Sequence, residues 1–186
     1  MKIRLSQPQM LSIWRLHRLL EPIRHDAEVT RVDGVDLDAI LTAEMDRWYI
    51  ELLLKASQEL LVSHDITGEI VISSYGDGCA FISLPPEVVR VLSVRLSGWK
   101  SSAIPISADT PVAMRQRLPY TRADASSPVA VLSGDGLCLY PASSDSSVAE
   151  LKCVIYKEGE YEFMREALAS VSPLDSESFT PLKTVQ

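Results

Sequence analysis

The hydrophobic positions of this chain follow a helical period in the first third and a period of two after it. Between residues 37 and 62, apolar side chains recur three or four positions apart, and Ile40 widens the stripe. This spacing predicts one long amphipathic helix over about 37–62. Ser6 and Gln9 match the Ser-x-x-Gln capping box, so we expect an earlier helix that ends near Leu20.

Alternation of apolar and polar residues begins at Glu69 and predicts β-strands from there onward. Two Gly-Asp-Gly turns, at 76–78 and 134–136, lie between alternating segments and predict tight hairpins, because Asp-Gly sequences readily supply the positive φ that such turns need. The expected strands are 69–74, 79–84, 92–99, 129–133, 137–140 and 151–157, with a short edge strand at 104–106. Ala108–Ser127 is expected to be an irregular loop.

A closing helix and a polar tail complete the predicted fold. Apolar residues at helical spacing predict a helix over Tyr161–Val171, and 172–186 is expected to be a flexible tail. Because the helical patterns precede the strand patterns, we predict an α+β fold in which N-terminal helices pack on a C-terminal antiparallel β part. We expect a single domain over 1–171, helical over 1–66 and mainly β over 67–171.

The segment Leu84–Glu87, Leu-Pro-Pro-Glu, interrupts what otherwise reads as one long strand. Proline has no N–H to donate to a sheet, so the strand must end here, and we expect about one helical turn over 86–91. The alternation resumes at Leu92 and places Arg95 and Trp99 together on a mixed polar face. The chain is thereby predicted to turn into a second sheet or into a neighbouring position of the same one.

The composition favours a soluble protein of a reducing compartment. Cys79, Cys138 and Cys153 are an odd number of cysteines without a CxxC motif. The first ten residues lack the apolar core of a signal peptide, and no apolar run reaches the length of a membrane span. We therefore expect a cytoplasmic protein that has no membrane partner.

The net charge of −7 is unevenly distributed along the chain. Between Glu21 and Glu69 there are twelve acidic and four basic residues, a net charge of −8. Between Arg90 and Arg122 there are six basic residues and one acidic residue, a net charge of +5. Two interpretations remain open: the basic strands neutralise the acidic helices within one monomer, or each region meets an oppositely charged partner.

The sequence contains no recognisable signature of catalysis, metal binding or nucleotide binding. HExxH, GxGxxG, GxxxxGK[ST] and GxSxG motifs are all absent. We therefore expect no catalytic residue, no cofactor and no metal site, and a protein that is not an enzyme.

The basic middle region supplies the candidate interaction residues. Three arginines and a tyrosine fall within Arg115–Arg122, and guanidinium groups suit carboxylate or phosphate recognition. The acidic net charge of the chain opposes nonspecific binding to nucleic acid, so an acidic protein surface is the preferred partner. The candidates are Arg90, Arg95, Trp99, Lys100, Arg115, Arg117, Tyr120 and Arg122.

The run Ile82–Trp99 resembles a unit of known proteins. Its Leu-Pro-Pro-Glu corner between two strands, followed by Gly98 and Trp99, is similar to the strand–Leu-Pro-x-Asp/Glu–turn–strand unit of head–tail adaptor, or connector, proteins of tailed bacteriophages and prophages. Those proteins place helices ahead of a small β part, which matches the order predicted for Leu37–Tyr140. The resemblance implies a non-enzymatic virion component that forms a ring between portal and tail.

Three hypotheses follow for the function. The first is a structural assembly protein of phage or prophage origin, which predicts a ring or another concentration-dependent homo-oligomer. The second is a small binding module whose Arg115–Arg122 loop captures an anionic ligand or partner. The third is an enzyme, for which the sequence offers no catalytic residue.

Overall fold

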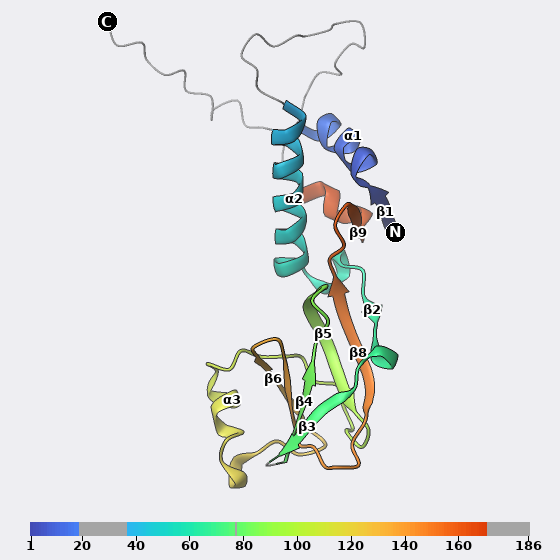
Figure 1. Cartoon of the computed structure of the whole chain (residues 1–186). Helices are drawn as coiled ribbons and strands as arrows, with labels where there is room; N and C mark the ends of the chain where they lie inside the picture. The colour runs from blue at the N-terminus through green and yellow to red at the C-terminus, as the bar shows by residue number, and fades with distance from the viewer. Residues whose placement is uncertain (19–36, 77, 171–186) are drawn as a thin grey trace, which may run out of the picture. The chain divides into compact units, whose positions relative to one another are not determined.

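The computed structural model describes residues 1–18, 37–76 and 78–170, so the predicted tail at 172–186 lies outside the described residues. Backbone contacts divide the described residues into two compact units, whose elements are labelled in Figure 1. One unit joins Met1–Leu61 with the residues from Glu158 onward, and the other spans Val62–Lys157. Among the described helices, none is both long enough and apolar enough to cross a membrane.

The first unit consists of two strands and two helices around an aromatic core. Its strands β1 (Lys2–Ser6) and β9 (Glu160–Met164) pair antiparallel. Its helices are α1 (Gln7–Arg18) and α2 (Leu37–Lys55), and two 3-10 turns, η1 (Gln58–Leu60) and η4 (Arg165–Ser170), complete it. The largest fully buried side chains of this unit are Met10, Trp14, Met45, Tyr49, Leu53 and Phe163.

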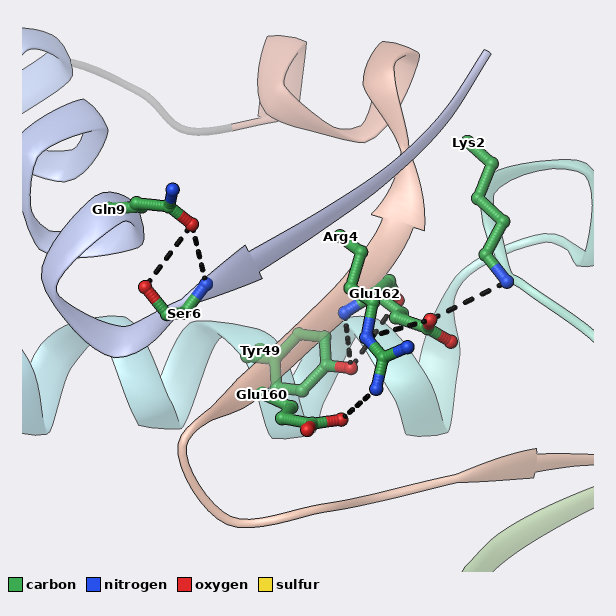
Figure 2. Close-up of polar contacts among 7 residues, drawn as sticks. All are labelled: Lys2, Arg4, Ser6, Gln9, Tyr49, Glu160 and Glu162. Atoms are coloured by element: carbon green, nitrogen blue, oxygen red, sulfur yellow. Dashed lines mark hydrogen bonds and ion pairs between the residues drawn. The ribbon is translucent and has the colours of Figure 1, made fainter.

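The predicted capping box stands at the start of α1. The Ser6 backbone N–H donates to Gln9 Oε1 at 3.0 Å, which satisfies a donor that the helix cannot bond itself (Figure 2). The predicted end of this helix near Leu20 lies outside the described residues.

Two predictions for this unit are wrong. The long helix ends at Lys55 and not near residue 62, because the chain tightens into η1, where the Leu60 N–H donates to the Ser57 carbonyl at 3.1 Å. The predicted closing helix over Tyr161–Val171 is instead β9 followed by η4. Burial alternates along β9, and β1, which was not predicted, supplies the partner strand from the other end of the chain.

The second unit is built from two antiparallel sheets. One sheet has the order β2 (His64–Asp65), β8 (Val148–Ile155), β5 (Val88–Leu96). The other has the order β3 (Ile72–Gly76), β4 (Cys79–Ser83), β7 (Gly136–Tyr140), β6 (Val129–Ser133). A short 3-10 turn, η2 (Thr67–Glu69), connects β2 to β3. Ile82, Leu137 and Leu139 of one sheet share a hydrophobic cluster with Val94, Leu96 and Leu151 of the other. The predicted α+β fold class is confirmed.

The proline corner moves the chain from one sheet to the other. The Val88 N–H donates to the Pro85 carbonyl at 3.0 Å, which closes a tight turn between β4 and β5. The predicted helical turn over 86–91 is wrong, because the chain pairs with β8 from Val88 onward. The corner does reorient the chain into a second sheet, which is one of the two outcomes that the sequence predicted.

Both predicted hairpins are present, and they use the shared Gly-Asp-Gly sequence in different registers. In β3–β4, Gly76 pairs with Cys79, so the loop begins after the first glycine of the motif. In β6–β7, Ser133 pairs with Gly136, so the loop begins one residue earlier in the motif, at Gly134. In each loop a glycine has positive φ, 69° at Gly78 and 59° at Gly134.

The segment predicted as an irregular loop, 108–127, carries two short helical elements. They are α3 (Pro111–Arg115) and η3 (Pro119–Thr121), and Thr110 caps α3 by accepting the Ala113 N–H at 3.3 Å. The predicted edge strand at 104–106 reduces to isolated bridges, in which Ala103 pairs with Val94 and Ile106 with Val131.

Candidate functional site

The candidate residues on β5 and just after it make contacts within the protein. Trp99 is 6% exposed, belongs to the core cluster and donates its indole N–H to the Pro141 carbonyl at 2.8 Å. It therefore does not share a face with Arg95, whose Nε lies 3.5 Å from Glu150 Oε2 on the opposing strand. Arg90 lies opposite Val154 in the same strand pair.

Lys100 is exposed just after the strand, and its backbone N–H donates to the Ala125 carbonyl at 2.8 Å.

The candidates of the 115–122 segment are brought together on one exposed stretch. Arg115, Arg117 and Tyr120 are exposed, and Tyr120 is fully so. Arg122 is half-buried and donates through Nε to the Gln116 carbonyl at 2.9 Å. A Cβ on Gly78 would lie 3.3 Å from Arg122 Nη1, so this guanidinium also lies against the β3–β4 turn. Arg122 holds the segment in place, whereas Arg115 and Tyr120 face solvent.

The buried side chain of Gln116 holds this segment through hydrogen bonds to its backbone. Its side chain is 3% exposed, donates through Nε2 to the Val112 carbonyl at 3.0 Å, and accepts the Ala123 N–H at 2.8 Å. Thr121 adds a bond from Oγ1 to the Arg115 carbonyl at 2.8 Å. Both ends of the buried amide are therefore bonded, and they link the backbone before Gln116 to the backbone after it.

The outward side of the segment carries apolar side chains between the arginines. We call this side the α3–η3 surface; it consists of the exposed residues Val112, Met114, Arg115, Arg117, Leu118 and Tyr120. Methionine, arginine and tyrosine are enriched in protein interfaces, whereas a solvated loop favours small polar residues. The arginines were predicted from the sequence; their grouping with exposed apolar residues was not.

A cavity of about 230 Å³ lies between this segment and the outer face of the four-stranded sheet. Its lining combines one cation with hydroxyl and thiol groups: the residues are Ala108, Ala113, Arg117, Val131, Leu132, Ser133, Cys138 and Tyr140. Burial raises the pKa of Tyr140 to about 12, and burial likewise raises the pKa of the nearby Cys79 to about 11. At neutral pH both groups are protonated, so Cys79 is a weak nucleophile and Tyr140 a hydrogen-bond donor.

The acidic pair Glu160 and Glu162 forms an ion-pair cluster within the first unit. Arg4 Nη2 lies 2.7 Å from Glu160 Oε2, and Arg4 Nε and Lys2 Nζ each lie 3.5 Å from Glu162 Oε1 (Figure 2). The Tyr49 hydroxyl accepts the Glu162 backbone N–H at 2.9 Å. These carboxylates stabilise the β1–β9 pair. Within the part of the chain that the structure describes, no group of three or more potential metal ligands gathers.

Helix α2 carries a second apolar stripe that faces solvent. Its buried stripe contains Leu41, Met45, Tyr49, Leu52 and Leu53. On the opposite side, Ile40, Ile50 and Leu54 are 46%, 42% and 48% exposed. Together with exposed Ala43 and Arg47 they repeat at alternating spacings of three and four, and we call these five residues the α2 stripe.

The periodicity of the sequence placed Ile40 on the core-facing stripe, and the exposed α2 stripe was not predicted. The signal was present in the spacing: positions 40, 43, 47, 50 and 54 alternate by three and four, as the contact positions of a helix that packs on another chain do.

Comparison with known proteins gives no match: neither a family model nor a curated protein nor a solved structure is significantly similar to this chain.

Proposed function

We propose that this chain is a non-enzymatic structural protein that assembles with copies of itself through the α2 stripe. The observation that carries the proposal is the exposure of Ile40, Ile50 and Leu54 in one row along α2. Scattered exposed apolar residues are ordinary, but a row at contact spacing along a helix marks an interaction surface.

The energetics favour a concentration-dependent oligomer. Burying a whole isoleucine or leucine side chain contributes about 1.5–3 kcal/mol, so covering the exposed half of each of these three contributes about 1 kcal/mol apiece. This sum must offset the loss of rotational and translational freedom on association. The stripe alone therefore supports a weak contact, and a stable assembly needs further contacts or the avidity of many copies.

The specific form that we propose is a head–tail adaptor of a tailed phage or prophage. Its support is the resemblance of the Ile82–Trp99 unit, in which the proline corner joins β4 to β5. An adaptor acts as one of many identical copies, which agrees with a chain that leaves an apolar helix face exposed. In this reading the protein is cytoplasmic until it joins a virion, and its partners are itself and other structural proteins.

The test compares charge insertions on two exposed helix faces. Ile50→Glu with Leu54→Glu places carboxylates in the α2 stripe, and Leu16→Glu places one on α1 at a residue that is also well exposed. Glutamate is a good helix former, so neither change should unfold its helix. Light scattering coupled to size exclusion, across a concentration series up to about 1 mM, would detect association free energies of about −4 kcal/mol or stronger.

We expect the wild type and Leu16→Glu to form the same oligomer and the double variant to be monomeric with an unchanged melting temperature. A wild type that stays monomeric throughout the series would contradict the proposal. So would a double variant that assembles as well as the wild type.

A second candidate function rests on the cavity beside α3. Arg117 and the Tyr140 hydroxyl both line it, and a guanidinium beside a hydroxyl donor suits a small anion such as a carboxylate or phosphate. We expect citrate or phosphate to raise the melting temperature of the wild type and not that of Arg117→Ala. Equal shifts in both proteins, or none in either, would remove this candidate.

A further inference from the structure

We infer that Cys138 and Cys79 form a redox-active dithiol, in which hydrogen peroxide oxidises Cys138 and Cys79 then closes a disulfide with it. The observation behind this is that two thiols from neighbouring strands meet on the outer face of the four-stranded sheet, beside the cavity under α3. This modification site is independent of self-assembly, so either proposal can fail while the other stands.

The register of the sheet brings the two cysteines together. Cys138 of β7 lies opposite Phe81 of β4, and Cys79 lies two residues before Phe81, so the cysteines are diagonal neighbours on one face. The Cys79 thiol interacts with the Cys138 thiol and with the Tyr140 hydroxyl. Both cysteines are half-buried and reduced. The pairing of β4 with β7 therefore holds two thiols within reach of each other.

The two thiols are suited to different steps. Cys138 lines the cavity of about 230 Å³ beside α3, so a small oxidant that enters this cavity meets its sulfur. Burial raises the pKa of Cys79 to about 11, so Cys79 is protonated at neutral pH and attacks a peroxide slowly. That handicap matters less against a sulfur that already lies beside it, because the second step is intramolecular. Cys138 is therefore the attacking thiol and Cys79 the resolving thiol.

Both chemical steps balance with hydrogen peroxide as the oxidant. The Cys138 sulfur attacks one peroxide oxygen, an S–O bond forms, the O–O bond breaks, and the leaving hydroxide takes up the thiol proton as water. Cys138 is then a sulfenic acid, oxidised by two electrons, and the peroxide is reduced. The Cys79 sulfur next displaces the sulfenic oxygen, an S–S bond forms, and hydroxide leaves with the Cys79 proton as a second water.

The disulfide is expected to be strained and easily reduced. Diagonal neighbours in an antiparallel pair have Cα atoms about 7–8 Å apart, whereas disulfides usually join Cα atoms about 4.4–6.8 Å apart. Closing the bond therefore draws Cys79 toward Cys138. Cys79 is the first residue of β4 and follows Gly78, whose φ is 69°, so the movement falls on a turn. Strained disulfides have higher reduction potentials, which suits a reversible modification in a reducing compartment.

Closing the bond should also loosen the segment that contains Arg115 and Arg117. A Cβ on Gly78 would lie 3.3 Å from Arg122 Nη1, so the turn that moves lies against the guanidinium that anchors this segment. Brief trypsin treatment of the native chain should therefore cut after Arg115 and Arg117 faster in the oxidised protein than in the reduced one. Equal rates would overturn this coupling.

Peptide mapping of the oxidised full chain tests the dithiol itself. Trypsin releases the three cysteines in separate peptides, 56–90, 123–152 and 153–157. In a urea-unfolded chain, Cys138 should pair with Cys153, fifteen residues away, about eight-fold more often than with Cys79, fifty-nine residues away, because shorter loops cost less entropy to close. In the folded chain treated with hydrogen peroxide at neutral pH, we expect the link between 56–90 and 123–152 as the main product. A folded chain that gives the unfolded pattern, or only links between molecules, would overturn the inference.

Two serine variants separate the roles of the thiols. Cys79→Ser lacks the resolving thiol, so the sulfenic acid of Cys138 should accumulate and be trapped by dimedone. Cys138→Ser lacks the attacking thiol, so Cys79 should carry at least ten-fold less dimedone. Equal labelling in the two variants would overturn the assignment of roles, and the mapping of the wild type tests the disulfide even where a variant folds poorly.

Reduction completes the test. Millimolar reduced glutathione should return the oxidised wild type to two free thiols, and with them the slower trypsin cleavage of the reduced protein. A link between Cys79 and Cys138 that survives this treatment would overturn the reversible modification.

Discussion

At the scale of single residues, buried polar groups determine the conformation of the segment that bears the candidate site. Gln116 is a buried amide whose oxygen and nitrogen are both bonded to backbone groups on either side of it. These bonds replace the regular hydrogen bonds that the loop lacks. The exposed arginines next to it contribute little to stability, because surface charges stabilise a fold little.

Replacing Gln116 by methionine should loosen this segment. The change keeps the length of the side chain but leaves the Val112 carbonyl and the Ala123 N–H without partners, which costs about 1–3 kcal/mol in the free energy of unfolding. Arg117→Met, at the exposed neighbouring position, should cost no more than about 0.5 kcal/mol. Urea titration of both variants measures this difference, and equal stabilities would show that the amide does not hold the loop.

The half-buried thiol of Cys79 and the buried thiol of Cys153 predict a loss of stability in alkali. Burial raises the pKa of both Cys79 and Cys153 from 9.0 to about 11. Above about pH 9 the unfolded chain loses these protons while the folded chain keeps them, so the free energy of unfolding falls as the pH rises toward 11 and is unaffected below 9. Urea titrations across this range should show that the free energy of unfolding falls less steeply with pH in Cys79→Ala than in the wild type. Equal slopes in the two proteins would contradict a raised pKa of Cys79.

At the scale of elements, two glycines of the β6–β7 hairpin have different physical roles. Gly134 adopts a positive φ, and a Cβ there would meet no other atom. The position therefore favours glycine because of its backbone conformation and not because of crowding. Gly136 does not have a positive φ, but a Cβ there would lie 2.2 Å from the Ile82 carbonyl oxygen and 2.6 Å from the Phe81 ring. The close approach of β7 to β4 therefore depends on the absence of a side chain at this position.

Alanine at these two positions should give unequal losses of stability. Gly136→Ala forces the strands apart and should cost about 3 kcal/mol, near the upper end for overpacking. Gly134→Ala places an alanine in the left-handed region and should cost about 1 kcal/mol. Gly134→Asn, which tolerates that region, should cost less than Gly134→Ala. Denaturant midpoints rank the three variants, and the reverse order would refute the steric role of Gly136.

At the scale of the whole molecule, acidic and basic residues are separated along the sequence. Some charges are neutralised internally, as Arg95 is by Glu150 and Arg15 by Asp38. Others are exposed, as Arg115 and Arg117 are. Internal neutralisation therefore accounts for some of these charges, and an external partner for the others stays a prediction.

Assembly should weaken as salt rises if the oppositely charged regions of the chain meet between copies. At about 0.15 M ionic strength the screening length is about 8 Å, and it shortens further at higher salt. We expect the dissociation constant from analytical ultracentrifugation to rise with sodium chloride for the wild type, and to rise less for Arg115→Glu with Arg117→Glu. Assembly that strengthens with salt would indicate a contact governed by apolar burial alone.

Local patterns in the sequence were enough to predict much of the fold. The two hairpins, the capping box of α1 and the presence of a long helix from Leu37 were predicted correctly, because each depends on neighbouring residues and on the steric limits of glycine and proline. The basic segment was found in the same way, since clustered arginines are visible in the sequence. Helix ends were less accurate, because Leu60 and Leu61 continue the apolar spacing beyond the last turn of α2.

Tertiary structure decided the features that depend on distant partners. Glu160–Met164 is a strand because Lys2–Ser6 pairs with it from the opposite end of the chain, and local propensity alone could not reveal this. Trp99 is buried because the chain turns after Leu96 and returns the indole to the Pro141 carbonyl. The sequence by itself determined the period of each element, whereas only packing decided which apolar face of α2 is buried, because a side chain's exposure depends on what the rest of the chain places against it.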